Sequence, residues 1–194
     1  MSVESLRRSH GLDPKSRPVR LAAVVYRSGF PIDGFMATVA HELRAAGLDV
    51  AGVIQENAGD APTPCAAMDL TDLADGTRTR ISQDLGPHAE GCRLDPQALA
   101  RLDAPLDRRI AARPDLLLLN KFGKAEAEGD GLRAVLARAL ERGVPVLTAV
   151  RPPHTEAWQA FHGGLAVELA PDLDAVLAWC RRAGADRDGA AAAP

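Results

Sequence analysis

A run of four leucines at positions 116 to 119 constrains the fold of this chain more than any other sequence feature. An unbroken apolar run of this length is typical of a strand buried on both faces, as in the centre of a parallel sheet. Polar residues follow at once, among them Asn120, Lys121, Gly123, Lys124 and Glu126. Because open α/β folds hold ligands at the carboxyl ends of such strands, the run predicts a ligand site here. The alternative is that these side chains only solvate the end of a strand.

The rest of the chain alternates strand-like and helix-like segments, which indicates an α/β fold. We expect strands at 20–26, 49–55, 116–119, 144–150 and 165–169, with helices between them and a last helix at 173–180. This arrangement predicts three layers, a mainly parallel sheet with helices on both faces. Asp75-Gly76 adds an inserted β-hairpin, and Pro105 is expected to divide the region after Asp95-Pro96 into two short helices. A single domain over 20–183 would lie between a disordered leader, 1–19, and a disordered tail, 184–194.

The net charge and the lengths of the apolar runs limit which partners and which compartment we expect for the protein. The net charge of −3 gives no general attraction to nucleic acid or to an anionic membrane. No apolar run approaches the roughly 20 residues that span a bilayer, and the first residues lack the apolar segment of a secretory signal. We therefore expect a cytoplasmic protein with no nucleic-acid partner and no membrane insertion, and a homodimer is left open.

The cysteines do not form a recognisable metal or disulfide pattern. Cys65, Cys92 and Cys180 are odd in number and widely spaced, which argues against a disulfide framework. His88 lies four residues before Cys92, unlike the paired Cys-x-x-Cys spacing of a structural zinc site. We interpret the thiols as buried or incidental, and only Cys92, next to Arg93, as a candidate for a ligand site.

A glycine-containing turn follows the first expected strand and precedes a helix. Gly29 and Gly34 have the spacing of the phosphate-binding loop G-x-x-x-x-G-K-[ST], and the helix start offers N–H groups to an anion. Phe35 and Met36 stand where that pattern places its lysine and its magnesium-binding hydroxyl. Asp33 would cap the helix, and its charge would oppose a phosphate. The turn can position an anion but cannot hydrolyse ATP in the usual way; a plain glycine turn is the alternative.

Three segments occur in order along the chain: ISQDLG at 81–86, GCRLD at 91–95 and NKFGKAEAEG at 120–129. With the strand–turn–helix at 20–46 and the hairpin at 69–83, they resemble an uncharacterised bacterial domain family often encoded beside molybdate-transport genes. That family is similar to the small P-loop nucleoside-triphosphatases of the thermophile and vertebrate type. The resemblance implies a P-loop NTPase-like fold and a link to molybdenum or molybdenum-cofactor handling.

The resemblance also bears on catalysis. In these hydrolases the central strand ends in the pattern D-E-x-G-K-x-E. Gly123, Lys124 and Glu126 match this pattern, whereas Asn120 and Lys121 replace its acidic pair. The resemblance therefore implies that the magnesium-bound water and the catalytic carboxylate are lost, and phosphoryl transfer without them should be very slow.

We expect a non-hydrolysing, degenerate P-loop-like protein that binds a nucleotide or a molybdate-like oxyanion, and we identify no metal ligands. The candidate ligand-binding residues are Ser28, Gly29, Asp33, Gly34, Ser82, Gln83, Cys92, Arg93, Asn120, Lys121, Gly123, Lys124 and Glu126. The glycine turn and the polar segment after the leucine run should leave neighbouring strands and therefore face a common crevice. Lys124 would supply the missing positive charge there, joined by Arg93 or Arg151, and Glu126 would orient Lys124 or cap the next turn.

Two alternatives remain open. The first is an active magnesium-dependent nucleoside-triphosphatase with relocated groups, in which Lys124 binds the phosphates and Glu126 or Asp84 binds the metal. The second is a protein-interaction module built on an inactive NTPase scaffold.

Overall fold

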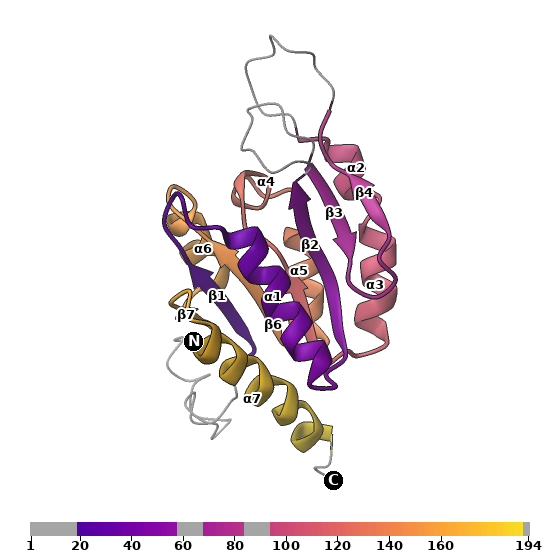
Figure 1. Ribbon diagram of the computed structural model, residues 1–194, viewed down its shortest axis with the longest axis vertical. Coiled ribbons are helices and arrows are strands. Elements are labelled where there is room, and N and C mark those ends of the chain that lie inside the picture. Colours follow the sequence, from indigo (N-terminus) through magenta and orange to yellow (C-terminus); the bar gives the residue numbers. More distant parts are fainter. Residues whose placement is uncertain (1–18, 58–67, 84–93, 192–194) are drawn as a thin grey trace, which may run out of the picture.

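The computed structural model describes residues 19–57, 68–83 and 94–191, so residues 1–18 of the expected leader lie outside it. The described chain forms a seven-stranded sheet of order β4-β3-β2-β5-β6-β1-β7 (Figure 1). The strands are β1 (Leu21–Val25), β2 (Val50–Asn57), β3 (Met68–Asp72), β4 (Arg78–Arg80), β5 (Leu116–Leu119), β6 (Val146–Val150) and β7 (Ala166–Leu169). The β2–β3 and β3–β4 pairings are antiparallel, and the pairings among β1, β2, β5, β6 and β7 are parallel. The expected mainly parallel sheet with an inserted hairpin is therefore confirmed.

Helices cover both faces of this sheet (Figure 1). They are α1 (Ile32–Ala45), α2 (Pro96–Ala100), α3 (Asp103–Ala111), α4 (Lys124–Ala127), α5 (Arg133–Glu141), α6 (Thr155–His162) and α7 (Leu173–Ala191). Helices α1 and α7 pack in one apolar cluster with one face of the sheet, while α2, α3, α5 and α6 pack in a second cluster with the other. The result is the expected three-layer α/β fold. Within the described residues, no helix is long and apolar enough to cross a membrane.

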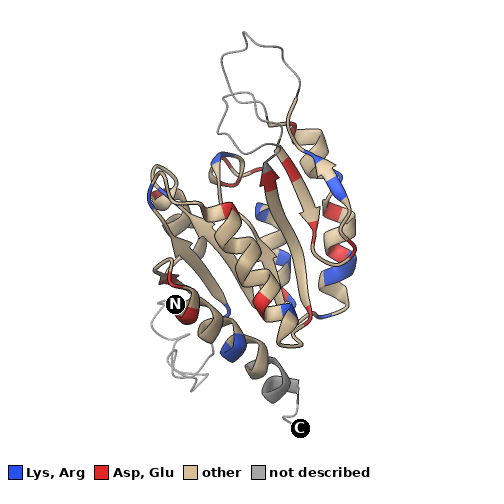
Figure 2. Ribbon diagram, viewed as in Figure 1, with Lys and Arg blue, Asp and Glu red and all other residues tan. Residues whose placement is uncertain are grey.

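Strand β5 is the centre of the core. It lies between β2 and β6, and its four leucines are at most 2% exposed. Because side chains alternate along a strand, Leu116 and Leu118 pack toward α1 and α7, whereas Leu117 and Leu119 pack toward the other layer. Each fully buried leucine stabilises the fold by about 1.5–3 kcal/mol. Figure 2 shows the same pattern at a larger scale, since β1, β5 and β6 carry no charged residue along their length.

The β3–β4 hairpin extends the sheet beyond β2. Its turn contains the Asp75-Gly76 pair, with Gly76 at a φ of +74°, a conformation that glycine adopts without strain. The Asp72 N–H donates to the carbonyl of Thr77 across the turn, at 2.9 Å. The hairpin predicted from this dipeptide is therefore confirmed.

Three details of the helices and strand order differ from expectation. Pro105 lies inside the first turn of α3, where a missing N–H costs nothing, and the two short helices separate before it. Helix α7 continues to Ala191, past residue 180 and into the tail expected to be disordered from residue 184. Strand β6 separates β1 from β5, so the glycine turn and the leucine strand do not leave neighbouring strands.

Candidate functional site

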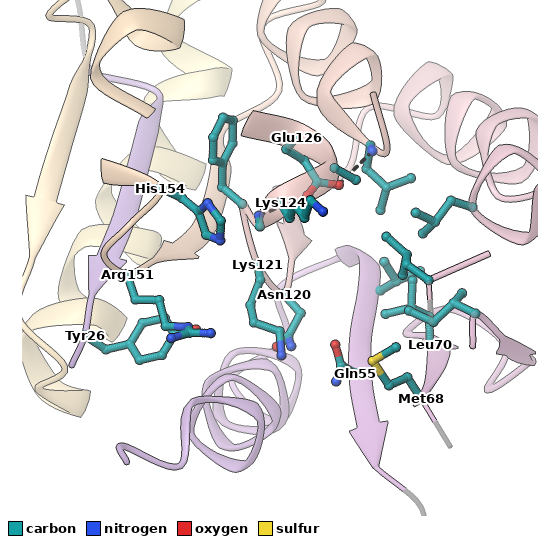
Figure 3. Close-up of a pocket in the computed structure, with 18 residues that line it drawn as sticks. Tyr26, Gln55, Met68, Leu70, Asn120, Lys121, Lys124, Glu126, Arg151 and His154 are labelled. Atoms are coloured by element: carbon teal, nitrogen blue, oxygen red, sulfur yellow. Dashed lines mark hydrogen bonds between the residues drawn. The ribbon is translucent and has the colours of Figure 1, made fainter. Parts of the chain in front are cut away.

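A cavity of about 290 Å³ opens at the carboxyl edge of the sheet, beside the end of β5 (Figure 3). Residues from the ends of β1, β2 and β5, the loop after β6, the hairpin, α2 and α4 contribute to its walls. Its polar lining consists of Tyr26, Gln55, Asn120, Lys121, Lys124, Glu126, Arg151 and His154. Five of the candidate residues, Asn120, Lys121, Gly123, Lys124 and Glu126, line it, so the polar segment after the leucine run does border a cavity.

Asp33, in the first turn of α1, connects that helix to the end of β5. Asn120 Nδ2 donates to Asp33 Oδ1 at 2.6 Å, and Lys121 Nζ lies 3.0 Å from the same oxygen. The start of α1 therefore does meet the end of β5, even though β6 lies between the two strands. The capping role expected for Asp33 is wrong, because Pro31 is the N-cap residue and no side chain caps α1. The Asp33 carboxylate instead pairs with the ammonium group of Lys121.

The glycine-containing turn uses much of its hydrogen-bonding capacity internally. The N–H groups of Phe30 and Ile32 donate to carbonyls of the same turn, at 3.2 and 2.8 Å. Gly29 has a φ of +87°, so the turn itself requires a glycine there. The candidate residues Ser28, Gly29 and Gly34 do not line the cavity beside β5. Asp33 is thus the residue of this turn that contacts the polar candidates after β5, whereas Ser28, Gly29 and Gly34 lie outside the cavity lining.

Glu126 is buried and connects the start of α4 to the start of α5 by two hydrogen bonds, called the Glu126 brace here. Only 7% of the residue is exposed, and its Oε2 accepts the N–H of Gly123 while its Oε1 accepts the N–H of Leu132, both at 2.9 Å. A Cβ at Gly131 would lie 2.3 Å from Oε1, which explains the glycine at that position. Of the two roles expected for Glu126, the geometry supports the capping of the following turn and not the orientation of Lys124.

Basic side chains gather on one side of the cavity. Lys121 and Lys124 follow β5, and Arg151 and His154 belong to the loop after β6 (Figure 3). Lys121 is paired with Asp33, whereas the Lys124 ammonium lies 3.8 Å from Glu128 in a solvent-exposed contact, which is weak. The side chains of Lys124 and Arg151 thus offer the more accessible positive charge.

Tyr26, at the end of β1, lies beside Arg151 on the same side (Figure 3). Burial raises the pKa of the Tyr26 phenol, and the nearby Asp33 carboxylate raises it further, against the opposing charge of Arg151. The phenol is therefore protonated at neutral pH and can donate a hydrogen bond.

The sequence analysis assigned no site role to Tyr26, Gln55 or His154. His154 could have been recognised as a candidate because it follows a buried strand, β6, as Lys121 follows β5.

Several other candidates lie away from the cavity or outside the described chain. Ser82 Oγ accepts the N–H of Met68 at 3.0 Å at the base of the hairpin, and neither Ser82 nor Gln83 lines the cavity. The residues Cys65, Asp84, His88, Cys92 and Arg93 lie outside the described residues.

Cys180 is a core residue, as expected. It is fully buried in α7, and burial raises the pKa of its thiol to about 12, so the thiolate form is negligible at neutral pH. Within the described part of the chain, no group of three or more His, Cys, Asp or Glu side chains is arranged to hold a metal ion.

The fold is that of a three-layer α/β protein, and solved structures share it. A human cancer-related nucleoside triphosphatase aligns with a TM-score of 0.58 and 16% identity, over 78% of this chain and 88% of that one. The protein THEP1 from Aquifex aeolicus aligns with a TM-score of 0.58 and 14% identity, over 84% of this chain and 100% of that one. At these identities the likeness concerns the fold.

The chain belongs to the family DUF2478, described as a protein of unknown function, whose profile matches residues 21–179. It is also 39% identical, over 164 residues, to the molybdenum import ATP-binding protein ModC 2 of Bradyrhizobium diazoefficiens. This match covers 84% of the present chain but 18% of that protein, so the chain spans less than a fifth of its relative's length.

Proposed function

We propose that this protein binds a small anionic ligand, a nucleotide or an oxyanion, in the cavity beside β5, and that it does not hydrolyse it. The observation that carries this proposal is the gathering of Lys121, Lys124 and Arg151, with His154, on one side of a cavity at the carboxyl edge of the sheet. Ligand sites of open α/β folds lie at this edge, and converging cations stabilise a bound anion. The fold shared with nucleoside-triphosphatases supports a nucleotide as one class of ligand.

The absence of hydrolysis is supported by the chemistry at the strand end. Both carboxylate oxygens of Glu126 accept backbone N–H groups, so this residue is a poor choice for the metal ligand of a relocated hydrolase site. Asn120 and Lys121 occupy the place of the acidic pair in the hydrolases that this chain resembles, and neither can act as a carboxylate. Phosphoryl transfer relies on a positioned metal and a group that orients the nucleophile.

A molybdenum link is a narrower form of the proposal. It is supported by the 39% identity to a part of a molybdenum import ATP-binding protein. On this view the ligand, or the process the protein serves, belongs to the handling of molybdenum or of its cofactor.

A thermal-shift screen combined with a phosphate-release assay tests the proposal. ATP, GTP, phosphate, sulfate, molybdate and tungstate would be added to the wild-type protein, with magnesium present in the release assay. A ligand at 100 times its Kd stabilises the native state by about 2.7 kcal/mol, which raises Tm by roughly 5–10 °C in a protein of this size. We expect such a shift with at least one of these anions, and no phosphate release above a blank. Release that depends on magnesium would instead identify a hydrolase.

A further inference from the structure

The cavity has two chemically distinct halves. Lys121, Arg151 and His154 lie on one side, whereas Met68 and Leu70 of the hairpin lie on the other (Figure 3). Ile81, Leu99 and Leu132, from the continuation of the hairpin, α2 and the start of α5, also line the cavity and share one apolar cluster with Leu70, against which Met68 packs. These five residues are called the apolar half here.

The hairpin and α2 form most of the apolar half, which lies beside the carboxyl edge of the sheet. Leu70, Ile81 and Leu99 are 3–6% exposed and belong to the main apolar cluster, so their positions are fixed by packing. Met68 is only half-buried and packs against that cluster from its edge. Met68 is therefore the residue of the apolar half that leaves appreciable apolar surface in contact with water, and an apolar part of a ligand would remove that surface from water.

The size of the cavity also bears on the ligand. At about 290 Å³ it is close to the lower end of the range for small-molecule sites, roughly 300–1,000 Å³. A tetrahedral oxyanion would contact the cationic side and leave the apolar half unfilled.

We propose that the ligand is an organic anion with an aromatic or heterocyclic ring, whose charged group faces Arg151 and Lys124 and whose ring lies against the apolar half. This inference rests on the proposed function, because it assumes that the same cavity binds an anion. The proposed function names a nucleotide or an oxyanion as the ligand, and this inference favours an organic ligand over a bare oxyanion. It also gives the inserted hairpin a role, as the wall that selects the ring.

Calorimetric titration with matched phosphates tests this inference. Methyl phosphate and phenyl phosphate carry the same charged group, and only phenyl phosphate has a ring. We expect phenyl phosphate to bind at least tenfold more tightly than methyl phosphate. Equal affinities would overturn the inference while leaving anion binding intact. If neither ester binds while an anion of the thermal-shift screen does, this inference fails and the proposed function stands. If none of those anions binds either, both fail.

Substitutions at Met68 separate ring contact from anion contact. Met68→Gln keeps the length of a half-buried side chain but makes it polar, so it should lower phenyl phosphate affinity about threefold to tenfold and leave methyl phosphate unchanged. Met68→Leu stays apolar and should retain the wild-type preference. Arg151→Ala should weaken both esters. An equal loss of both esters in Met68→Gln would contradict the inference, and unchanged melting temperatures without ligand would show that these variants are folded.

Discussion

At the scale of single residues, the carboxylate of Asp33 sets how much positive charge the cavity offers. Its Oδ1 is 2.6 Å from Asn120 Nδ2 and 3.0 Å from Lys121 Nζ, and both donors line the cavity. Lys121 is therefore partly neutralised before any ligand arrives, and an anion would depend more on Lys124 and Arg151. The same contacts hold the start of α1 against the end of β5, so Asp33 has a structural and an electrostatic effect.

Asp33→Asn should strengthen anion binding. The amide oxygen can still accept from Asn120, while the negative charge that competes with the ligand for Lys121 is gone. We expect affinity for the anion to rise about threefold or more, equal to roughly 0.7 kcal/mol or more. The loss of a charged hydrogen-bond acceptor should lower the free energy of unfolding by at most about 1.5–3 kcal/mol.

Calorimetric titration measures the anion affinity of Asp33→Asn, and urea unfolding measures its free energy of unfolding. Asp174→Asn is the matched control, because Asp174 also lies in the first turn of a helix but is exposed and away from the cavity. Weaker anion binding in Asp33→Asn, with an unchanged control, would mean that Asp33 helps to hold the ligand.

At the scale of elements, the short helix α4 depends on the brace made by Glu126. One carboxylate joins the N–H of Gly123 to the N–H of Leu132, and so fixes the segment that connects β5 to α5. This segment supplies Lys124 to the cationic side and Leu132 to the apolar half. The shape of the cavity therefore depends on a side chain that has no spare oxygen for a ligand.

Glu126→Gln should destabilise the protein. A glutamine side chain has a single acceptor oxygen, so one of the two N–H groups would lose its partner and face an NH₂ group. A buried donor without a partner costs about 1–3 kcal/mol, and we expect a decrease of that size in the free energy of unfolding. Glu128→Gln, at an exposed position next to α4, should change it by no more than about 0.5 kcal/mol. Equal effects of the two substitutions would show that the brace does not stabilise the fold.

At the scale of the whole molecule, local signals in the sequence predicted the elements better than their arrangement. The leucine run and the Asp75-Gly76 turn were recognisable because each depends on a few adjacent residues. The order of strands was not, since the place of β6 between β1 and β5 depends on contacts between residues far apart in the sequence. The contact of Asp33 with Lys121 was missed for the same reason.

The length of α7 has a different cause. The segment 184–194 has few large apolar residues and was therefore expected to be disordered, but it is rich in alanine, the strongest helix former. Trp179, Cys180 and Ala183 pack into the cluster beneath α1, which anchors the helix from which this segment continues. Packing of this part of the helix thus accounts for helical structure that continues past residue 183.

The central claim is that the anion binds beside β5 and not on the glycine turn, and titrations of four variants test it directly. ATP, phosphate and molybdate would be titrated into Lys124→Ala, Arg151→Ala, Gly34→Ala and, as an exposed control outside the cavity, Arg44→Ala. A Cβ at Gly34 would have no heavy atom within 4 Å, so this substitution should fold, but it would crowd a phosphate held on the turn. We predict that Lys124→Ala and Arg151→Ala each weaken binding at least tenfold, while Gly34→Ala and Arg44→Ala bind as the wild type does. Loss of binding in Gly34→Ala, with wild-type affinity in Lys124→Ala and Arg151→Ala, would contradict the claim and place the ligand on the turn.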